Sequence, residues 1–179
     1  LMGGLGKLMP YTAFCFLIGT MAISALPPFN GFVSEWFTYQ SLFTLSQSDD
    51  FVLKLAGPIA IIMLALTGAL AALCFVKVYG ISFGGAPRSE KAANAREVPK
   101  PMVIAMAVLA LCCVLLGVGA SVVTPIIAKI STALAHSEPL MLAQNGVVVA
   151  QAEPHTALST PMVTIMLLAF FFLPFSFYA

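Results

Sequence analysis

The feature that most constrains this chain is a proline-containing break inside an apolar stretch. Pro27 and Pro28 interrupt the stretch, Asn30 and Gly31 follow, and a helical pattern then resumes that carries Glu35 in its first turns. Proline removes a backbone donor and disfavours helix in the residue before it, so one helix must end here before the next begins. The sequence therefore predicts a discontinuous helix with an acidic residue just beyond its break.

Composition places this break in a membrane. Hydrophobic residues make up 60% of the 179 positions and charged residues only 8%, whereas about a quarter of the residues in a soluble domain are charged. The chain is therefore predicted to be an integral membrane protein, and its net charge of +1 offers no field for nucleic acid. In lipid, each backbone polar group that a break leaves free costs several kcal/mol, so protein or water must shield the break.

The sequence lacks the patterns of several other kinds of site. Its four cysteines lie inside apolar runs and have no metal-knuckle or redox spacing, so we interpret them as small residues of membrane helices. Two histidines in a polar loop are interpreted as solvated side chains. We find no nucleophile–base set, phosphate loop or metal-ligand spacing, and we expect neither a cofactor nor covalent catalysis in this chain. The first residues have no signal-peptide pattern, and we interpret the chain as a piece of a longer protein.

The apolar segments predict an all-α, polytopic bundle of about five transmembrane spans. The predicted spans are residues 11–26, 31–45, 55–76, 102–127 and 161–177. The first is short, because a full crossing needs about 20 residues. It can cross only if neighbouring helices shield it, if its helix starts early at Pro10, or if the break itself lies within the membrane.

The distribution of charge predicts which segments face the cytoplasm. The loop at residues 80–101 holds four of the eight basic residues, so the positive-inside rule places it in the cytoplasm. Residues 131–160 contain no Lys or Arg and are predicted to lie outside. Five crossings then place residues 1–9 and 46–54 outside as well, with the turn at 27–30 inside.

Glu35 is the first candidate functional residue. A carboxylate in the bilayer costs roughly 3 kcal/mol on insertion scales, so such a residue usually faces the bundle interior or a water path. There it could take up and release a proton. The alternative is that Glu35 lies at the headgroup level and only stabilises the start of its helix. Counted from a helix start at Gly31, it lies about 6 Å inward, which favours the inner half of the membrane unless the break itself is sunk into the protein.

Four more residues are candidates for the same proton path. Thr38 and Tyr39 share one face of the predicted helix with Glu35. Together with Thr67 they either hydrogen-bond a chain of water molecules or simply satisfy one another. Lys77, at the inner end of the third span, either joins the path or anchors the helix at the interface.

Several sequence runs resemble those of a known membrane family. The run MGGLGKLMP at residues 2–10 and the run LPPFNGFVSEW at residues 26–36 are similar to the late core helices of the antiporter-like subunits that complex I, Mrp antiporters and membrane-bound hydrogenases share. Further runs at residues 66–71, 77–80 and 84–88 look most like the branch found in hydrogenase-4 and formate hydrogenlyase.

This resemblance implies a function in proton conduction. In the family, the helix after the Pro-Pro break carries a central ionisable residue of a proton half-channel, and the matching residue here is Glu35. The resemblance also implies a multi-pass subunit of the bacterial inner membrane, with partner membrane and hydrophilic subunits that hold iron–sulfur clusters and a nickel–iron centre. Residues 1–130 would form the end of the channel core and the helices after it. Residues 131–179 would form an external loop and a terminal span.

Three other functions stay open at this point. The chain could serve a cation/proton antiporter without redox partners, or the membrane part of an NADH–quinone oxidoreductase. It could also be a structural scaffold in which Glu35 has no transport role.

Overall fold

The computed structural model describes residues 3–135, 143–145, 148–150, 157–159, 162–163 and 165–166. Helices dominate these residues, which confirms the predicted all-α bundle. The helices are α1 (Leu5–Leu8), α2 (Pro10–Ile23), α3 (Asn30–Ser46), α4 (Phe51–Phe83), α5 (Glu90–Ala93), α6 (Lys100–Val118) and α7 (Ala120–Ala135). Three short strands, β1 (Ala143–Asn145), β2 (Val148–Ala150) and β3 (Ala157–Ser159), form an antiparallel sheet in the order β1-β2-β3. They occupy part of the segment predicted to be a loop.

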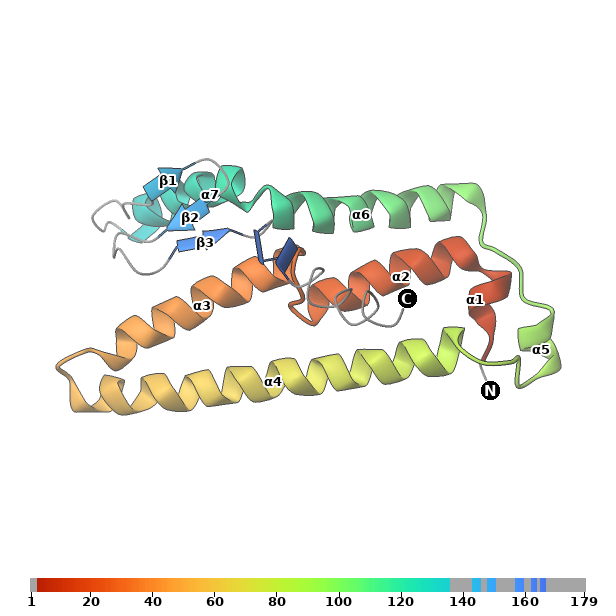
Figure 1. The fold of residues 1–179 in the computed structure, drawn as a ribbon, viewed down its shortest axis with the longest axis horizontal. Helices are drawn as coiled ribbons and strands as arrows, with labels where there is room; N and C mark the ends of the chain where they lie inside the picture. Colours follow the sequence, from red (N-terminus) through yellow and green to blue (C-terminus); the bar gives the residue numbers. More distant parts are fainter. Residues whose placement is uncertain are drawn as a thin grey trace, which may run out of the picture.

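The helices α2 and α3 together make one interrupted crossing. They follow each other end to end, and both lie against α4, which runs back along the pair (Figure 1). The 14 residues of α2 and the 17 of α3 span about 21 and 25 Å, and the 33 residues of α4 span about 50 Å. The predicted discontinuous helix is therefore confirmed. The prediction that its two halves are separate spans is wrong, since together they match the single helix α4.

Joining the two halves changes the predicted sidedness of the N-terminal segment. The N–H of Gly4 donates to the carbonyl oxygen of Gly84 at 2.9 Å, and the N–H of Tyr11 donates to the carboxylate of Glu97 at 3.0 Å. Residues 3–9 therefore lie at the same end as the loop after α4, and the prediction that they lie on opposite sides is wrong. The error came from counting one crossing twice.

A second interruption divides the predicted fourth span. The helix α6 ends at Val118 and α7 begins at Ala120, with Gly119 between them, and α7 continues to Ala135. In Figure 1, α7 continues beyond α6 toward the end where α3 meets α4. The predicted fifth span, residues 161–177, falls largely outside the described residues. Among the described residues, α4 and α6 are the two helices long and apolar enough to cross a membrane alone.

The helix α4 is longer than predicted at both ends, and local capping explains its early start. The carboxylate of Asp50 accepts a hydrogen bond from the N–H of Val52 at 3.0 Å, so the helix begins at Phe51. Such a cap is worth about 1 kcal/mol because it satisfies one of the free donors of the first turn. At the other end the helix passes Lys77 and stops at Phe83. Large apolar side chains cover the outside of α4, as expected for a helix surrounded by lipid or by other helices.

Candidate functional site

Backbone contacts shield the break between α2 and α3. The N–H of Leu26 donates to the carbonyl of Met21 at 3.1 Å, and that of Phe29 donates to the carbonyl of Leu26 at 3.1 Å. The turn itself therefore satisfies these donors. Phe29 is only 6% exposed. This agrees with the requirement that a break in lipid be shielded.

Two glycines allow the helices to meet closely at the break. A side chain at Gly31 would collide with the carbonyl oxygen of Ala22 at the end of α2. A side chain at Gly117 of α6 would collide with the backbone of Pro28 and Phe29. The absence of a Cβ atom at these two positions therefore brings α2, α3 and α6 together at one point.

Glu35 lies near the middle of the crossing. Its Oε1 atom is 3.1 Å from the position that a Cβ atom would take on Gly68 of α4. Gly68 is 17 residues after Phe51 and 15 before Phe83, or about 25 and 22 Å from the two ends of α4. The carboxylate therefore lies far from both ends of the longest helix. This geometry corresponds to a break sunk into the protein, and the shallow placement counted from Gly31 does not hold.

The Glu35 carboxylate borders a cavity of about 500 Å³ between α2, α3, α4 and α6. Its polar lining comes from Asn30, Ser34, Glu35 and Thr38, and the rest from small or apolar side chains that include Leu64 and Cys113. Among the described residues, the carboxylate forms no ion pair or hydrogen bond. An ionisable group that is half-buried at this depth and borders an open space is placed to exchange protons with water.

The structure brings together only some of the predicted path residues. Thr38 lines the Glu35 cavity, and its hydroxyl donates to the carbonyl of Ser34 at 3.0 Å. Tyr39 is half-buried one turn beyond Glu35 but is not among the residues that line this cavity. Of the predicted break residues, Asn30 and Gly31 line the cavity, whereas Pro27 and Pro28 form the turn, with a cis bond between them.

The two candidates on α4 lie outside the cavity. Thr67 is exposed, and its hydroxyl donates to the carbonyl of Met63 at 2.8 Å. Lys77 is exposed and lies nine residues beyond Gly68, about 14 Å along the helix. It lies six residues before the end of α4 and away from Glu35.

Sequence reasoning missed two contributors to the site. Cys113 of α6, interpreted as a buried helix residue, is half-buried and lines the Glu35 cavity. Gly68 belongs to the run at residues 66–71 and was given no role of its own, yet it faces the carboxylate. No local signal in the sequence identifies either one, because both act through contacts between helices.

A further cavity leads from the site along α2. Its volume is about 320 Å³, and it shares Gly19, Ile23 and Cys113 with the Glu35 cavity. It extends to Thr12 near the start of α2 and is mostly apolar. The two cavities therefore border the same residues, and the second reaches the end of the bundle that carries Glu97.

Glu97 fixes this end of the bundle. The hydroxyl of Thr12 donates to Oε1 at 2.5 Å, and the N–H of Tyr11 donates to Oε2 at 3.0 Å. Partial burial of Glu97 opposes its ionisation. The hydrogen bonds from Thr12 and from the backbone N–H groups of Val98, Tyr11 and Thr12 outweigh that effect and lower the pKa of Glu97 below its usual range. An ionised Glu97 thus ties the loop before α6 to the start of α2.

Comparison with known proteins is consistent with this geometry. Residues 1–63, which include the break and Glu35, match the family model of the transmembrane region of NADH:quinone oxidoreductase and Mrp antiporter subunits. The resemblance predicted from the sequence is confirmed. The matched residues end within α4, so α2, α3 and the first part of α4 carry the family pattern.

Two curated relatives cover nearly the whole chain. It is 50% identical over 97% of its length to "Hydrogenase-4 component B" of Escherichia coli (strain K12) and 45% identical over 97% to "Formate hydrogenlyase subunit 3" of the same organism. The chain spans about a quarter (26%) of the length of each of these relatives. It therefore compares with one part of such a subunit.

A solved structure has the same fold. The membrane-bound sulfane sulfur reductase, an archaeal respiratory membrane complex, contains a chain that matches with a TM-score of 0.71. The match covers 98% of this chain and 26% of that one, at 19% sequence identity. It supports the arrangement of helices described above.

Proposed function

We propose that this chain is part of a proton-conducting membrane subunit of a hydrogenase or formate hydrogenlyase type of complex, and that Glu35 carries protons across its middle. The observation that carries the proposal is the Glu35 carboxylate, which borders a cavity at mid-height beside a shielded helix break. A carboxylate in that position is costly and usually has a role in transport. The similarity to the two Escherichia coli subunits gives the class of complex.

The chemistry proposed for Glu35 is reversible protonation. The carboxylate takes a proton from water on one side and returns it to water on the other, and Asn30 and Thr38 help to hold that water. Glu35 lies in the second turn of α3, just beyond the helix break. Lys77 is proposed to anchor α4 at the interface and to take no part in the transfer.

The surrounding assembly follows from the same proposal. The complex would lie in a bacterial inner membrane, with the basic segment before α6 and the start of α2 in the cytoplasm. Asp49 and Asp50, between α3 and α4, would then face outward. Partner subunits would carry out the redox reaction with iron–sulfur clusters and a nickel–iron centre, and this chain would contribute no catalytic residue. We also propose that residues 131–179 form an external segment and a last span.

The test is Glu35→Gln in the full-length protein within its complete complex. Gln keeps the size and polarity of the side chain but cannot ionise, so we expect assembly to be retained and proton movement into sealed vesicles to be lost. The matched control is Glu90→Gln on the exposed helix α5, which should leave both unchanged. Unchanged hydrogen production together with unchanged proton movement in Glu35→Gln would remove Glu35 from the mechanism.

The same preparation separates the alternatives. An antiporter would move protons in exchange for sodium in membranes that contain no hydrogenase or iron–sulfur subunits. An NADH–quinone oxidoreductase subunit would copurify with NADH-oxidising partners. A scaffold would tolerate Glu35→Gln with no change in transport.

A further inference from the structure

The cavity of about 320 Å³ between α2, α4 and α6 is lined mostly by apolar groups. Two threonines belong to its lining, and both donate their hydroxyl protons to the protein. Thr12 donates to Oε1 of Glu97, and Thr20 donates to the carbonyl of Leu17 at 2.7 Å. Water in a protein cavity needs about two to four polar partners, whereas an apolar cavity binds apolar molecules. The lining of this cavity therefore suits a hydrocarbon better than water.

The shape of this cavity fits one extended hydrocarbon chain. Along α2 it reaches from Thr12 to Ile23, which is 11 residues or about 16 Å. This length is about half of the roughly 30 Å hydrocarbon core of a bilayer, or one leaflet. A volume of about 320 Å³ over that length gives a mean cross-section of about 20 Å², whereas a helix about 10 Å across needs about 80 Å². The cavity is therefore too narrow to hold a further helix of the full-length protein.

The cavity opens on the apolar surface of the bundle. Ile23 and Leu109 line it, and their side chains are 61% and 68% exposed. In a membrane, a surface of this kind faces lipid tails or other helices. Because the cavity is too narrow for a helix, a lipid tail is the apolar group that can enter it from the side.

Basic residues gather at the end of the bundle where this cavity begins. Residues 3–9 and 84–100 meet there, beside the starts of α2 and α6 (Figure 1). The two segments contain five basic residues and two acidic ones, Glu90 and Glu97. The basic residues are all exposed, and none forms an ion pair within the described part of the chain; they are Lys7, Arg88, Lys91, Arg96 and Lys100. Their charges are therefore available to an anion.

Lys100 connects this charge to the cavity. It begins α6, and Met106, the first residue of α6 that lines the cavity, is six residues further along, or about 9 Å. The carboxylate of Glu97, three residues before Lys100, is held by the hydroxyl of Thr12 and the N–H of Tyr11 at the start of α2. Lysine buries its stem along apolar surface and extends its ammonium group to the headgroup level. An anionic headgroup above the cavity is therefore within reach of Lys100.

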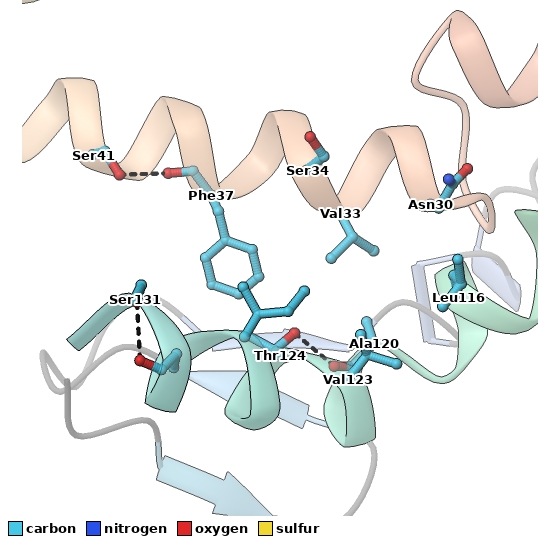
Figure 2. A pocket seen from close by; sticks show the side chains of 12 residues that line it. Asn30, Val33, Ser34, Phe37, Ser41, Leu116, Ala120, Val123, Thr124 and Ser131 are labelled. Carbon is cyan, nitrogen blue, oxygen red and sulfur yellow. Dashed lines mark hydrogen bonds between the residues drawn. The ribbon is translucent and has the colours of Figure 1, made fainter. Parts of the chain in front are cut away.

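A larger groove between α3 and α7 lacks this combination. Its volume is about 490 Å³, and Figure 2 shows Val33 and Phe37 pointing from α3 toward it, with Thr124 of α7 opposite. It lies toward the other end of the bundle. There the described residues carry equal numbers of acidic and basic side chains, namely Asp49, Asp50, Lys54 and Lys129. Charge therefore distinguishes the cavity along α2 from the larger groove.

We propose that the cavity along α2 binds one acyl chain of an anionic phospholipid, whose headgroup lies among the basic residues at the start of α6. The chain runs along α2 past Gly19 and ends near Ile23 and Cys113. Each lysine or arginine close to an anionic headgroup strengthens binding roughly fivefold. The apolar lining thus holds the tail, and the basic cluster selects the headgroup.

The first experiment identifies the lipid by cross-linking. The full-length protein within its complex is placed in phosphatidylethanolamine vesicles that contain a small amount of one photoreactive probe. The probe is either phosphatidylglycerol, which is anionic, or phosphatidylcholine, which is zwitterionic, with the same photoreactive group at the end of one acyl chain. We expect label on the residues around Ile23 and Cys113, roughly tenfold or more from the phosphatidylglycerol probe, because several basic residues act on its headgroup.

A second experiment fills the cavity. Gly19 lines it, and a Cβ atom at Gly19 would meet nothing within 4 Å, so Gly19→Leu adds a side chain to the open space. We expect the label around Cys113 to fall roughly fivefold or more. Gly80→Leu is the matched control, because a Cβ atom there also meets nothing within 4 Å and Gly80 lies outside the cavity.

A third experiment removes one charge from the basic cluster. Lys100→Gln should lower the preference for the phosphatidylglycerol probe roughly fivefold and leave the labelled residues the same. Lys54→Gln, which changes an exposed lysine at the opposite end of the bundle, should leave that preference unchanged.

Each result decides one part of the inference. If no label appears around Ile23 and Cys113, protein covers the cavity and the lipid site is refuted. Equal label from the two probes would refute the anionic headgroup, and equal label in Gly19→Leu and Gly80→Leu would place the lipid elsewhere. These experiments measure lipid label and not proton movement, so the function proposed for Glu35 can fail without changing their results.

Discussion

Because Gly68 lies against Glu35, a substitution at Gly68 can perturb the site while the Glu35 carboxylate itself is kept. In Gly68→Ala the new Cβ atom would stand 3.1 Å from Oε1 of Glu35, a separation that real Cβ atoms rarely show. The carboxylate must move away by a few tenths of an ångström. Because Oε1 is the far end of a flexible side chain, it can move without displacing either helix.

The size of the effect follows from this movement. A side chain pushed about 30° away from its preferred rotamer costs about 0.5–1.5 kcal/mol. If this cost raises the free energy of the Glu35 orientation that transfers the proton, the rate of proton movement falls about two- to tenfold. The helix itself should not suffer, since Ala in a helix interior is about 0.5–1 kcal/mol more favourable than Gly.

Gly80→Ala is the matched control for this prediction. Gly80 lies on the same helix, and a Cβ atom there would meet nothing within 4 Å. Both variants gain the same helix propensity, and only Gly68→Ala touches Glu35. Proton movement into vesicles, normalised to the amount of assembled complex, should therefore fall in Gly68→Ala alone. Equal rates in the two variants would refute the placement of Glu35 against α4.

Three further predictions use other contacts. Glu97→Ala should speed hydrogen exchange of the first α2 amides about 5- to 30-fold, as expected for a lost cap of about 1–2 kcal/mol. The pKa of Glu97 is lowered in the folded protein, so Glu97 stabilises the fold above the usual carboxyl pKa near 4.5 and loses this effect as the pH falls through the lowered pKa. Hydrogen exchange in Glu97→Ala should therefore lack this acid dependence. Gly117→Val should lower the yield of assembled complex by colliding with the break, whereas Gly19→Val, where a Cβ meets nothing within 4 Å, should not. In variants that keep a single cysteine, chemical modification of Cys113 should inhibit proton movement and modification of Cys112 should not, because of these two only Cys113 borders the Glu35 cavity. Equal inhibition in the two variants would contradict this assignment.

Local chemistry was enough to predict the break and its acidic residue. The adjacent Pro27 and Pro28 remove two backbone donors in a row and so favour the end of a helix, and Asn30 with Gly31 begins the next one. The membrane environment followed from composition, and the polar face with Glu35 and Thr38 followed from helical spacing. The structure places Glu35 and Thr38 on the same cavity.

The pairing of helices could not be predicted in the same way. The helix α4 is apolar on every side, so its sequence does not indicate that Gly68 faces Glu35. The same holds for Cys113, whose neighbour Cys112 has identical chemistry. Lys7 alone carries too little charge to decide the side of the N-terminal segment, and its neighbours are now seen to lie with the basic loop. Whether α2 and α3 are one crossing or two depends on contacts with α4 that lie outside their own residues.

The contact of Gly117 with the Pro28–Phe29 backbone has a mechanical consequence. Gly117 lies two residues before Gly119, where α6 gives way to α7. The interruption between α6 and α7 therefore lies beside the residues that begin α3. The same α3 holds its carboxylate against Gly68 of α4. The two interruptions are thus packed on each other, so a substitution that separates α6 from the turn would also disturb the start of the helix that positions Glu35.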